Sequence, residues 1–287
     1  MRLRYSEVTA YERDGYVVIP ECFSESELRL VGDEAERVLA LDIEGKVLED
    51  DSVTVRSVNG AHLHSEVLHT LGRHPRLLEP ARQLLNDEVY IHQFKINAKR
   101  ALAGDVWHWH HDYVFWHNED GMPDPRAINF VLFLDDVTEF NGPMLAIPGT
   151  HRLGLESETH EVHKFESASD SRDWHHHTSK QLKYTLDPSL LQRIIGQNGV
   201  VSVKGARGSI LIFHCCLFDS SGTNNMPWDR RLLFVTYNSV SNRLLQQSSP
   251  RPSFMANRDF SPLTAVPDDA LMDPRRNGMC GRQPSMI

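Results

Sequence analysis

A series of short apolar runs separated by turn residues fills most of the chain after residue 86 and constrains the fold more than any other feature. The runs are rich in Val, Ile, Phe and Tyr, which favour strands. Strands are expected in EVYIHQFKINAK, DVWHWHHDYVFW, AINFVLFLDDV, GPMLAIPGTH, GVVSV, GSILIFHCCLF and RRLLFVTYNSV. So many strands with short connections predict a mostly β fold, an antiparallel barrel or sandwich.

Helices are expected mainly before this series. SEVTAYERDG predicts a short helix that stops at Gly15, and YVVIP predicts a strand that ends at Pro20. Ser24 and Glu27 have the spacing of a capping box, which predicts a helix to about Leu41. HPRLLEPARQLL predicts a third helix, so helices should flank one side of the β structure.

We expect a single domain over residues 1–287, with a helical part over about 1–86 and a β core over about 87–260. Residues 154–183 are polar and too long for a tight turn, so they are predicted to form a lid. This segment contains DWHHHTSK. Three consecutive histidines cannot all face one ion from a regular element, so we interpret them as part of a solvated loop.

Composition narrows the range of partners. The formal net charge of −9 argues against nucleic acid or an anionic membrane surface as a partner. No segment resembles a signal peptide or is apolar over a membrane-spanning length, and four cysteines, two of them adjacent, do not suggest a disulfide framework. These features predict a cytoplasmic protein with a small-molecule partner. A homodimer is compatible with the sequence, which does not fix the oligomeric state.

The segment WHWHHDYVFWHNEDGM, which begins at Trp107, concentrates residues that bind metals. If residues 105–115 form a strand, His108, His110 and Asp112 share one face. A histidine and an aspartate two residues apart can then reach one ion, as in the two-histidine, one-carboxylate site of Fe(II) oxygenases. This pair alone is a weak signal, because a polar strand end with stacked aromatic rings has the same pattern.

Longer motifs give this pair a context. HHDYVFWHNEDGMP, NGPMLAIPGTHR, GSILIFHCCLFDSSGTN and RRLLFVTYN resemble the phytanoyl-CoA dioxygenase superfamily of Fe(II)/2-oxoglutarate oxygenases, and within it the ectoine hydroxylases and bacterial free-proline 4-hydroxylases. VYIHQFKINAK and PRPSFMANRD extend the likeness from about Tyr16 to Asp259. The resemblance implies a double-stranded β-helix (a cupin-like jelly roll) with flanking N-terminal helices, Fe(II) as cofactor, 2-oxoglutarate as cosubstrate and O2 as oxidant.

The resemblance also implies roles for individual residues. His110 and Asp112 match the first two iron ligands. Arg230 matches the arginine that binds the distal carboxylate of 2-oxoglutarate, a role that suits a planar guanidinium, whereas Arg231 would face the other way. Asn97 resembles an asparagine near the cosubstrate. The residues that resemble substrate contacts are Gln93, Trp116 and Arg251. The alternative for Trp116 is a position in the core, and the alternative for Arg251 is an ion pair on the surface.

The third iron ligand departs from the pattern. The family has a histidine before a Gly/Ser-rich turn, and here FDSSGTN places Asp219 there, at the expected 230 − 219 = 11 residues before Arg230. His214 would face the opposite side of a continuous strand, so we expect it to pack. Asp219 can bind iron, but it is shorter than histidine and adds a second negative charge. A working site, an impaired site and rearranged ligation remain open.

The activity that the resemblance implies is hydroxylation of an unactivated C–H bond of a small free amino acid or similar zwitterion, with succinate and CO2 as coproducts. Altered ligation could favour desaturation or cyclisation, while retention of Asp112 argues against a halogenase. One alternative is a jelly-roll binder without catalysis. Another is a cupin-type metal enzyme that does not use 2-oxoglutarate and has His108 or His111 as an extra ligand. Strand parity would allow His108 to approach the ion together with His110, but not His111.

Overall fold

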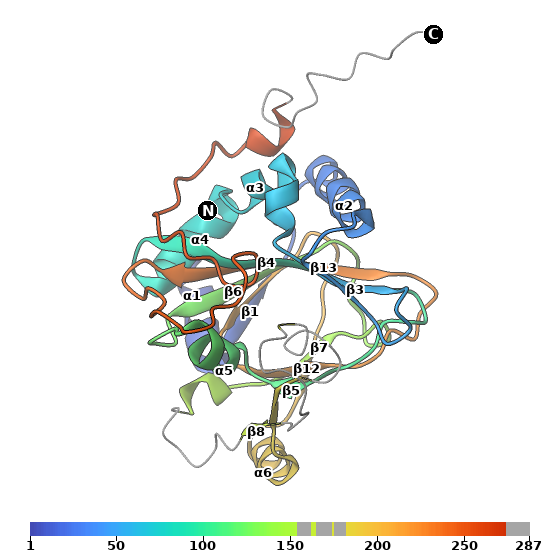
Figure 1. Ribbon diagram of the computed structural model, residues 1–287, viewed down its shortest axis with the longest axis vertical. Coiled ribbons are helices and arrows are strands. Elements are labelled where there is room, and N and C mark those ends of the chain that lie inside the picture. The colour runs from blue at the N-terminus through green and yellow to red at the C-terminus, as the bar shows by residue number, and fades with distance from the viewer. Residues whose placement is uncertain (154–161, 165–173, 175–181, 274–287) are drawn as a thin grey trace.

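Two antiparallel sheets lie face to face (Figure 1). In spatial order, the larger sheet contains β1 (Tyr16–Ile19), β11 (Ile210–His214), β6 (Ala127–Phe133), β13 (Arg230–Ser239), β4 (Val89–Lys99), β3 (Val55–Asn59) and β2 (Lys46–Leu48). The smaller sheet contains β10 (Val201–Val203), β7 (Met144–Ile147), β12 (Phe218–Ser221) and β5 (Trp107–His110). Strands β8 (Val162–Lys164) and β9 (Tyr184–Leu186) form a separate pair. This arrangement is a jelly roll and confirms the predicted fold class.

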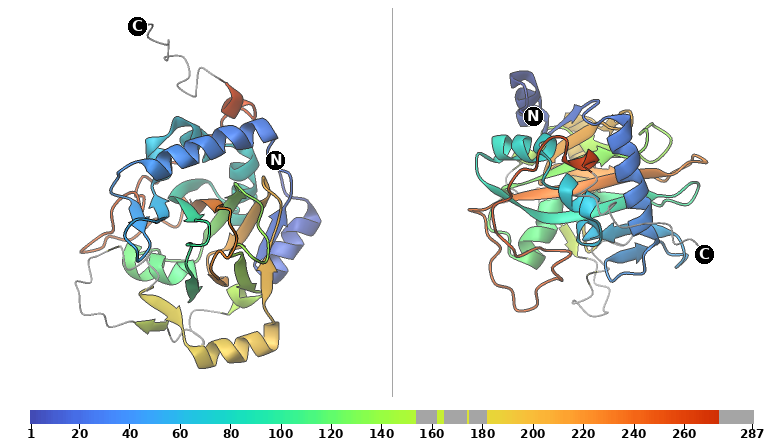
Figure 2. Two further views of the ribbon diagram at one scale, coloured as in Figure 1. Left: turned by 90° about the vertical axis from the view of Figure 1, so that its right-hand side faces the viewer. Right: turned by 90° about the horizontal axis from the view of Figure 1, so that it is seen from above.

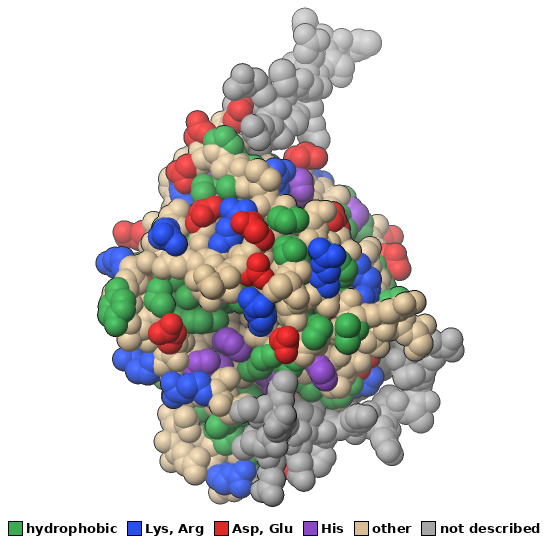
Figure 3. All heavy atoms as spheres, turned by 90° about the vertical axis from the view of Figure 1, so that its left-hand side faces the viewer, with side chains coloured by type: hydrophobic (Ala, Val, Ile, Leu, Met, Phe, Trp, Pro, Cys, Tyr) green, Lys and Arg blue, Asp and Glu red, His purple; other side chains and the backbone are tan. Residues whose placement is uncertain are grey.

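The computed structural model describes residues 1–153, 162–164, 174 and 182–273. Most of the predicted lid, including its three consecutive histidines, lies outside these residues. Within them, no helix has both the length and the apolar character needed to cross a membrane. On the face shown in Figure 3, Lys and Arg side chains are interspersed with Asp and Glu.

Helices cover the outer face of the larger sheet (Figures 1 and 2). The helices along the chain are α1 (Tyr5–Asp14), α2 (Glu25–Ala40), η1 (Ala61–His64), α3 (Glu66–Leu71), α4 (Pro75–Leu85), α5 (Asp112–Phe115), the π-helix η2 (Trp116–Asp120), η3 (Thr150–Arg152), α6 (Pro188–Asn198) and η6 (Ala270–Met272). Side chains of α2, α3 and α4 pack with the outer face of the sheet in one large apolar core. A second core lies between the sheets.

The predicted ends of the first helices are confirmed. Gly15 adopts a left-handed φ of 83° after α1 and donates its N–H to Tyr11. At the start of α2, Ser24 and Glu27 form the capping box. Helix α6 was not predicted, although Asp187, Pro188 and Gly199 mark its two ends in the way typical of helices.

Two predicted strands end early. The strand through the histidine-rich segment stops at His110, and Asp112 begins helix α5. The backbone N–H of Tyr113 then bonds to the carbonyl oxygen of Cys215. Strand β11 stops at His214, where Leu217 donates to the His214 carbonyl in a tight turn, and β12 follows. The sequence interpretation assumed a continuous strand through each segment. Because both strands end early, the direction of side chains cannot be deduced from alternation across either one.

Side-chain alternation on the larger sheet separates core from cavity. On β4, Phe94, Ile96 and Ala98 enter the helix-covered core, while Gln93, Lys95 and Asn97 line a cavity between the sheets. On β13 the core residues are Leu233 and Val235, and the cavity residues are Arg230, Leu232 and Phe234. Each strand thus uses one face for stability and the other for the cavity.

The capping box of α2 makes a testable contribution to stability. Ser24→Ala removes the side-chain acceptor for the Glu27 N–H and should lower the free energy of unfolding by about 1 kcal/mol. Urea denaturation of the metal-free protein measures this change. Thr9→Ala is a matched control, because Thr9 is exposed within α1 and bonds only to the carbonyl of Tyr5. Equal losses in both variants would contradict the capping role.

Candidate metal and cosubstrate site

The cavity between the sheets brings together every residue that the family resemblance matched to an iron, cosubstrate or substrate contact. Its walls include His110 from β5, Asp112 from α5 and Asp219 from β12. The other predicted site residues in its lining are Gln93, Asn97, Trp116, Arg230 and Arg251. These eight side chains come from positions as far apart as 93 and 251 and converge only in the folded chain. The cavity is therefore the candidate site.

His110 and Asp112 face each other with their free ligand atoms. The Nδ1 atom of His110 lies 2.7 Å from the carbonyl oxygen of His108. Because a carbonyl oxygen can only accept a hydrogen bond, Nδ1 carries the proton of the ring. The Nε2 atom then keeps its lone pair and can bind a metal. Nε2 lies 3.9 Å from Oδ1 of Asp112. Because metal bonds to nitrogen and oxygen are about 2.1 Å long, both atoms can reach one ion between them.

A hydrogen-bond chain fixes the Asp112 carboxylate. Its Oδ2 atom accepts a bond of 2.7 Å from the Asn129 amide, and the Asn129 oxygen accepts one of 2.6 Å from the Thr236 hydroxyl. All three residues are buried. Partners of this kind orient metal ligands, and here they leave Oδ1 of Asp112 available.

Asp219 lies directly opposite His110 in the pairing of β12 with β5. The residue is buried, and its Oδ2 atom has no hydrogen-bond partner. However, Asp219 does not form a compact trio with His110 and Asp112. Within the described ranges, the one group with three ligand atoms within 4.8 Å of one another is His214, Cys215 and Cys216. The ligand atoms of Asp219, His110 and Asp112 therefore do not all lie within 4.8 Å of one another, as expected from the short side chain of aspartate.

Electrostatics make the Asp219 carboxylate receptive to a cation. Burial raises the pKa of Asp219 to about 7. Among the neighbouring charges, His110 and Lys95 lower this pKa, and Asp112 raises it. A carboxylate without hydrogen bonds in a buried place is costly to ionise, so a metal ion there would be stabilising.

Arg230 presents a buried guanidinium without an anion. Its bonds go to the backbone carbonyls of Gly142, at 2.6 Å, and Asn141, at 3.4 Å. No carboxylate among the described residues lies within 4 Å of it, and burial lowers its pKa to about 9. The neighbouring Arg231 instead forms a bidentate ion pair with Asp135 outside the cavity. Arg230 therefore fits an incoming carboxylate.

Arg251 and Trp116 border the cavity, and both are buried. Two bonds, of 2.7 and 2.6 Å, join Arg251 to Asp120, so its ion pair is internal and not on the surface. Burial alone would raise the pKa of Asp120, but Arg251 and His92 together lower it to about 2. The π-helix η2 starts at Trp116 and ends at Asp120. Such helices are rare and frequently lie at functional sites.

The amides on β4 differ in their bonding. Gln93 donates a bond of 2.6 Å to the Met255 carbonyl, whereas the buried Oδ1 of Asn97 has no partner. The sequence interpretation missed Lys95, which lies between them and also lines the cavity. Its position could have been deduced, because alternation on β4 places Lys95 on the same face as Gln93 and Asn97. Nothing in the sequence indicated the roles of Asn129 and Thr236.

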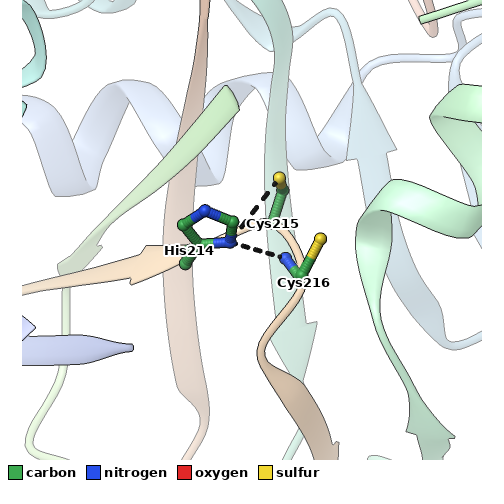
Figure 4. Close-up of side chains that lie close together, drawn as sticks. All are labelled: His214, Cys215 and Cys216. Carbon is green, nitrogen blue, oxygen red and sulfur yellow. Dashed lines mark hydrogen bonds between the residues drawn. The ribbon is translucent and has the colours of Figure 1, made fainter. Parts of the chain in front are cut away.

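The three other histidines considered as possible ligands, His108, His111 and His214, lie outside the cavity. His108 is exposed, although strand parity had allowed it to approach the metal, because the pairing of β5 with β12 shifts register between His110 and Trp107 and alternation is broken there. His111 is buried and stacks on Phe218, with 5.6 Å between ring centroids. His214 lies beside Cys215 and Cys216 (Figure 4), and none of these three lines the cavity. The Nδ1 atom of His214 already accepts the Cys216 N–H at 3.0 Å.

A histidine–carboxylate pair with open positions between the sheets of a jelly roll is the arrangement of non-haem iron oxygenases. The phytanoyl-CoA dioxygenase (PhyH) model matches residues 11–232. The L-proline trans-4-hydroxylase of Streptomyces griseoviridis is 38% identical over 261 residues, which cover 91% of this chain and 95% of that protein. The chain therefore belongs to the phytanoyl-CoA dioxygenase family, as its motifs predict.

Two further similarities agree with this assignment. The ectoine dioxygenase of Bordetella bronchiseptica is 35% identical over 266 residues, covering 89% of this chain and 83% of that protein. The crystal structure of EctD from S. alaskensis with 2-oxoglutarate and 5-hydroxyectoine matches with a TM-score of 0.78 and 32% identity, covering 92% of this chain and 87% of that chain. The predictions of a jelly roll and of an enzyme of the dioxygenase class are confirmed.

The raised pKa of Asp219 predicts how pH changes the stability of the metal-free protein. An unfolded aspartate releases its proton near pH 4, whereas the folded state holds it to about pH 7. The folded state binds more protons between these values, so the free energy of unfolding should fall as pH rises through them. Asp219→Asn removes this charge and should be more stable than the unmodified protein by about 2 kcal/mol or more near pH 7.5.

Thermal and urea unfolding in the presence of a chelator test this expectation across the pH range. The two proteins should have similar stabilities near pH 3, below both pKa values, where the carboxyl is mostly protonated in folded and unfolded chains alike. Asp33→Asn, an exposed position on α2, is the control and should show no such divergence. A constant difference between Asp219→Asn and the unmodified protein at all pH values would contradict the burial of this charge.

Proposed function

We propose that this protein is an Fe(II)/2-oxoglutarate-dependent dioxygenase that hydroxylates an unactivated C–H bond of a small free amino acid or similar zwitterion, with succinate and CO2 as coproducts. The observation that carries the proposal is one cavity in which a His110–Asp112 pair with free ligand atoms shares its walls with the anion-free guanidinium of Arg230. The first feature suits a metal ion, and the second suits a carboxylate.

His110, Asp112 and Arg230 fit iron and its cosubstrate, and Asp219 adds an oxygen donor to the same cavity. His110, Asp112 and Asp219 would hold Fe(II), and Arg230 would bind the distal carboxylate of 2-oxoglutarate with Asn97 alongside. Iron with bound 2-oxoglutarate and O2 supplies the oxidising power for the C–H bond. Thr236 and Asn129 hold Asp112 in position, and the bond from the Nδ1–H of His110 to the His108 carbonyl leaves Nε2 as the atom that would bind the ion.

Substrate recognition would fall to three other residues of the cavity lining. Gln93, Trp116 and Arg251 offer an amide, a large ring and a guanidinium whose charge is balanced by Asp120. Such a set suits a small molecule that carries both charges itself. The named relatives, an L-proline hydroxylase and an ectoine dioxygenase, support a substrate of this size and class. The apolar rings of Phe115 and Trp116 would help exclude water.

A second candidate function is a binder whose metal centre is impaired. One observation favours it: Asp219 does not complete a compact group of ligand atoms with His110 and Asp112. In this case the cavity would bind an amino acid without oxidising it. A working centre with altered geometry could instead desaturate or cyclise the substrate.

Turnover assays distinguish these functions. With Fe(II), 2-oxoglutarate and O2, the protein should form succinate, and a panel of free amino acids that includes L-proline and ectoine should contain a compound that stimulates this reaction. Mass spectrometry of that compound should show a gain of one oxygen atom. Arg230→Met removes the carboxylate clamp and should raise the KM for 2-oxoglutarate by about 100-fold or more, since charged hydrogen bonds are lost.

Arg231→Met serves as the control, because Arg231 carries the same charge on the next residue but lies outside the cavity. It should leave the KM for 2-oxoglutarate nearly unchanged. Binding of an amino acid without succinate formation, in the unmodified protein and with fresh Fe(II), would refute the dioxygenase and support the binder.

A further inference from the structure

Lys95 is a cation of the cavity without an anionic partner. It projects from β4 between Gln93 and Asn97, and its Nζ atom lies 5.0 Å from the ring centroid of Phe234. No carboxylate lies within 4 Å of this amine in the part of the chain that the structure describes. Lys183 and Lys204, in contrast, pair with Glu119 and Glu139.

Asp219 is the matching unsatisfied anion on the opposite sheet. Its Oδ2 atom is buried without a hydrogen-bond partner, and it lines the same cavity as Lys95. The chain thus places a free ammonium across the cavity from the carboxylate that replaces a neutral histidine ligand.

We propose that Lys95 offsets the second negative charge that Asp219 brings to the metal centre and so allows the 2-oxoglutarate dianion to bind. This inference rests on the proposed function. Two carboxylate ligands and Fe(II) sum to −2 + 2 = 0, so the centre alone no longer attracts an anion. Lys95 and Arg230 together supply +2, which matches the −2 charge of 2-oxoglutarate.

The proposal makes the importance of Lys95 depend on the residue at position 219. With Asp219→His the centre regains a net positive charge, and the ammonium becomes dispensable for binding 2-oxoglutarate. If Lys95 instead binds the substrate carboxylate or contacts 2-oxoglutarate directly, its loss should have the same effect whichever residue is at position 219. A double-mutant cycle separates these cases.

The experiment compares the unmodified protein, Lys95→Met, Asp219→His and the double variant. Each is loaded anaerobically with Mn(II), whose affinity is measured by electron paramagnetic resonance, and is then titrated with 2-oxoglutarate by calorimetry. Lys95→Met should raise the Kd for 2-oxoglutarate about tenfold or more when Asp219 is present. In the Asp219→His background the same change should raise the Kd less than about twofold.

Two further variants complete the test. Lys95→Arg keeps the charge and should bind 2-oxoglutarate like the unmodified protein, which separates charge from correct folding. Arg230→Met should raise the Kd for 2-oxoglutarate about 100-fold or more in every background and thereby tests the proposed function by itself. Equal effects of Lys95→Met in both backgrounds, or no effect in either, would overturn the role of Lys95 while leaving the dioxygenase proposal intact. No binding of 2-oxoglutarate by any protein would overturn both.

Discussion

The alternation of side chains across β4 and β13 is the constraint on which the rest of the structure depends. Both strands are central in the larger sheet, and one face of each is committed to the helix-covered core. The opposite face must then line the space between the sheets. Gln93, Lys95, Asn97 and Arg230 therefore point into one cavity, and a shift of one residue in either strand would bury them among the helices.

Charge balance explains how so polar a cavity can exist inside the fold. Some buried charges are paired within the chain, such as Arg251 with Asp120 and Arg56 with Glu49. The cavity also holds two carboxylates, Asp112 and Asp219, and Arg230, which has no anion. Burying unpaired charges is costly, so this arrangement is stabilised when a divalent metal and a dicarboxylate complete it. The same residues that destabilise the empty fold therefore favour ligand binding.

The sequence predicted the class of fold because strand patterning and helix caps are local, as at Gly15 and Ser24. It also predicted which residues converge, but through family motifs in register and not through local rules. The continuous strands assumed in these segments end before Asp112 and before Leu217, at turns stabilised by long-range or turn hydrogen bonds, so the direction of these side chains could not be deduced from strand parity. Asn129 and Thr236 could not be predicted, since their importance arises from contacts with residues distant in sequence.

We propose that His110, Asp112 and Asp219 form a metal centre that still accepts 2-oxoglutarate. Anaerobic visible absorption tests it most directly, because 2-oxoglutarate chelated to Fe(II) gives a weak charge-transfer band. The unmodified protein with Fe(II) and 2-oxoglutarate should show this band, as should Asp219→His, and Arg230→Met should show it only at much higher 2-oxoglutarate concentrations. A band that appears in Asp219→His but is absent from the unmodified protein would contradict the claim and show that Asp219 disables the centre.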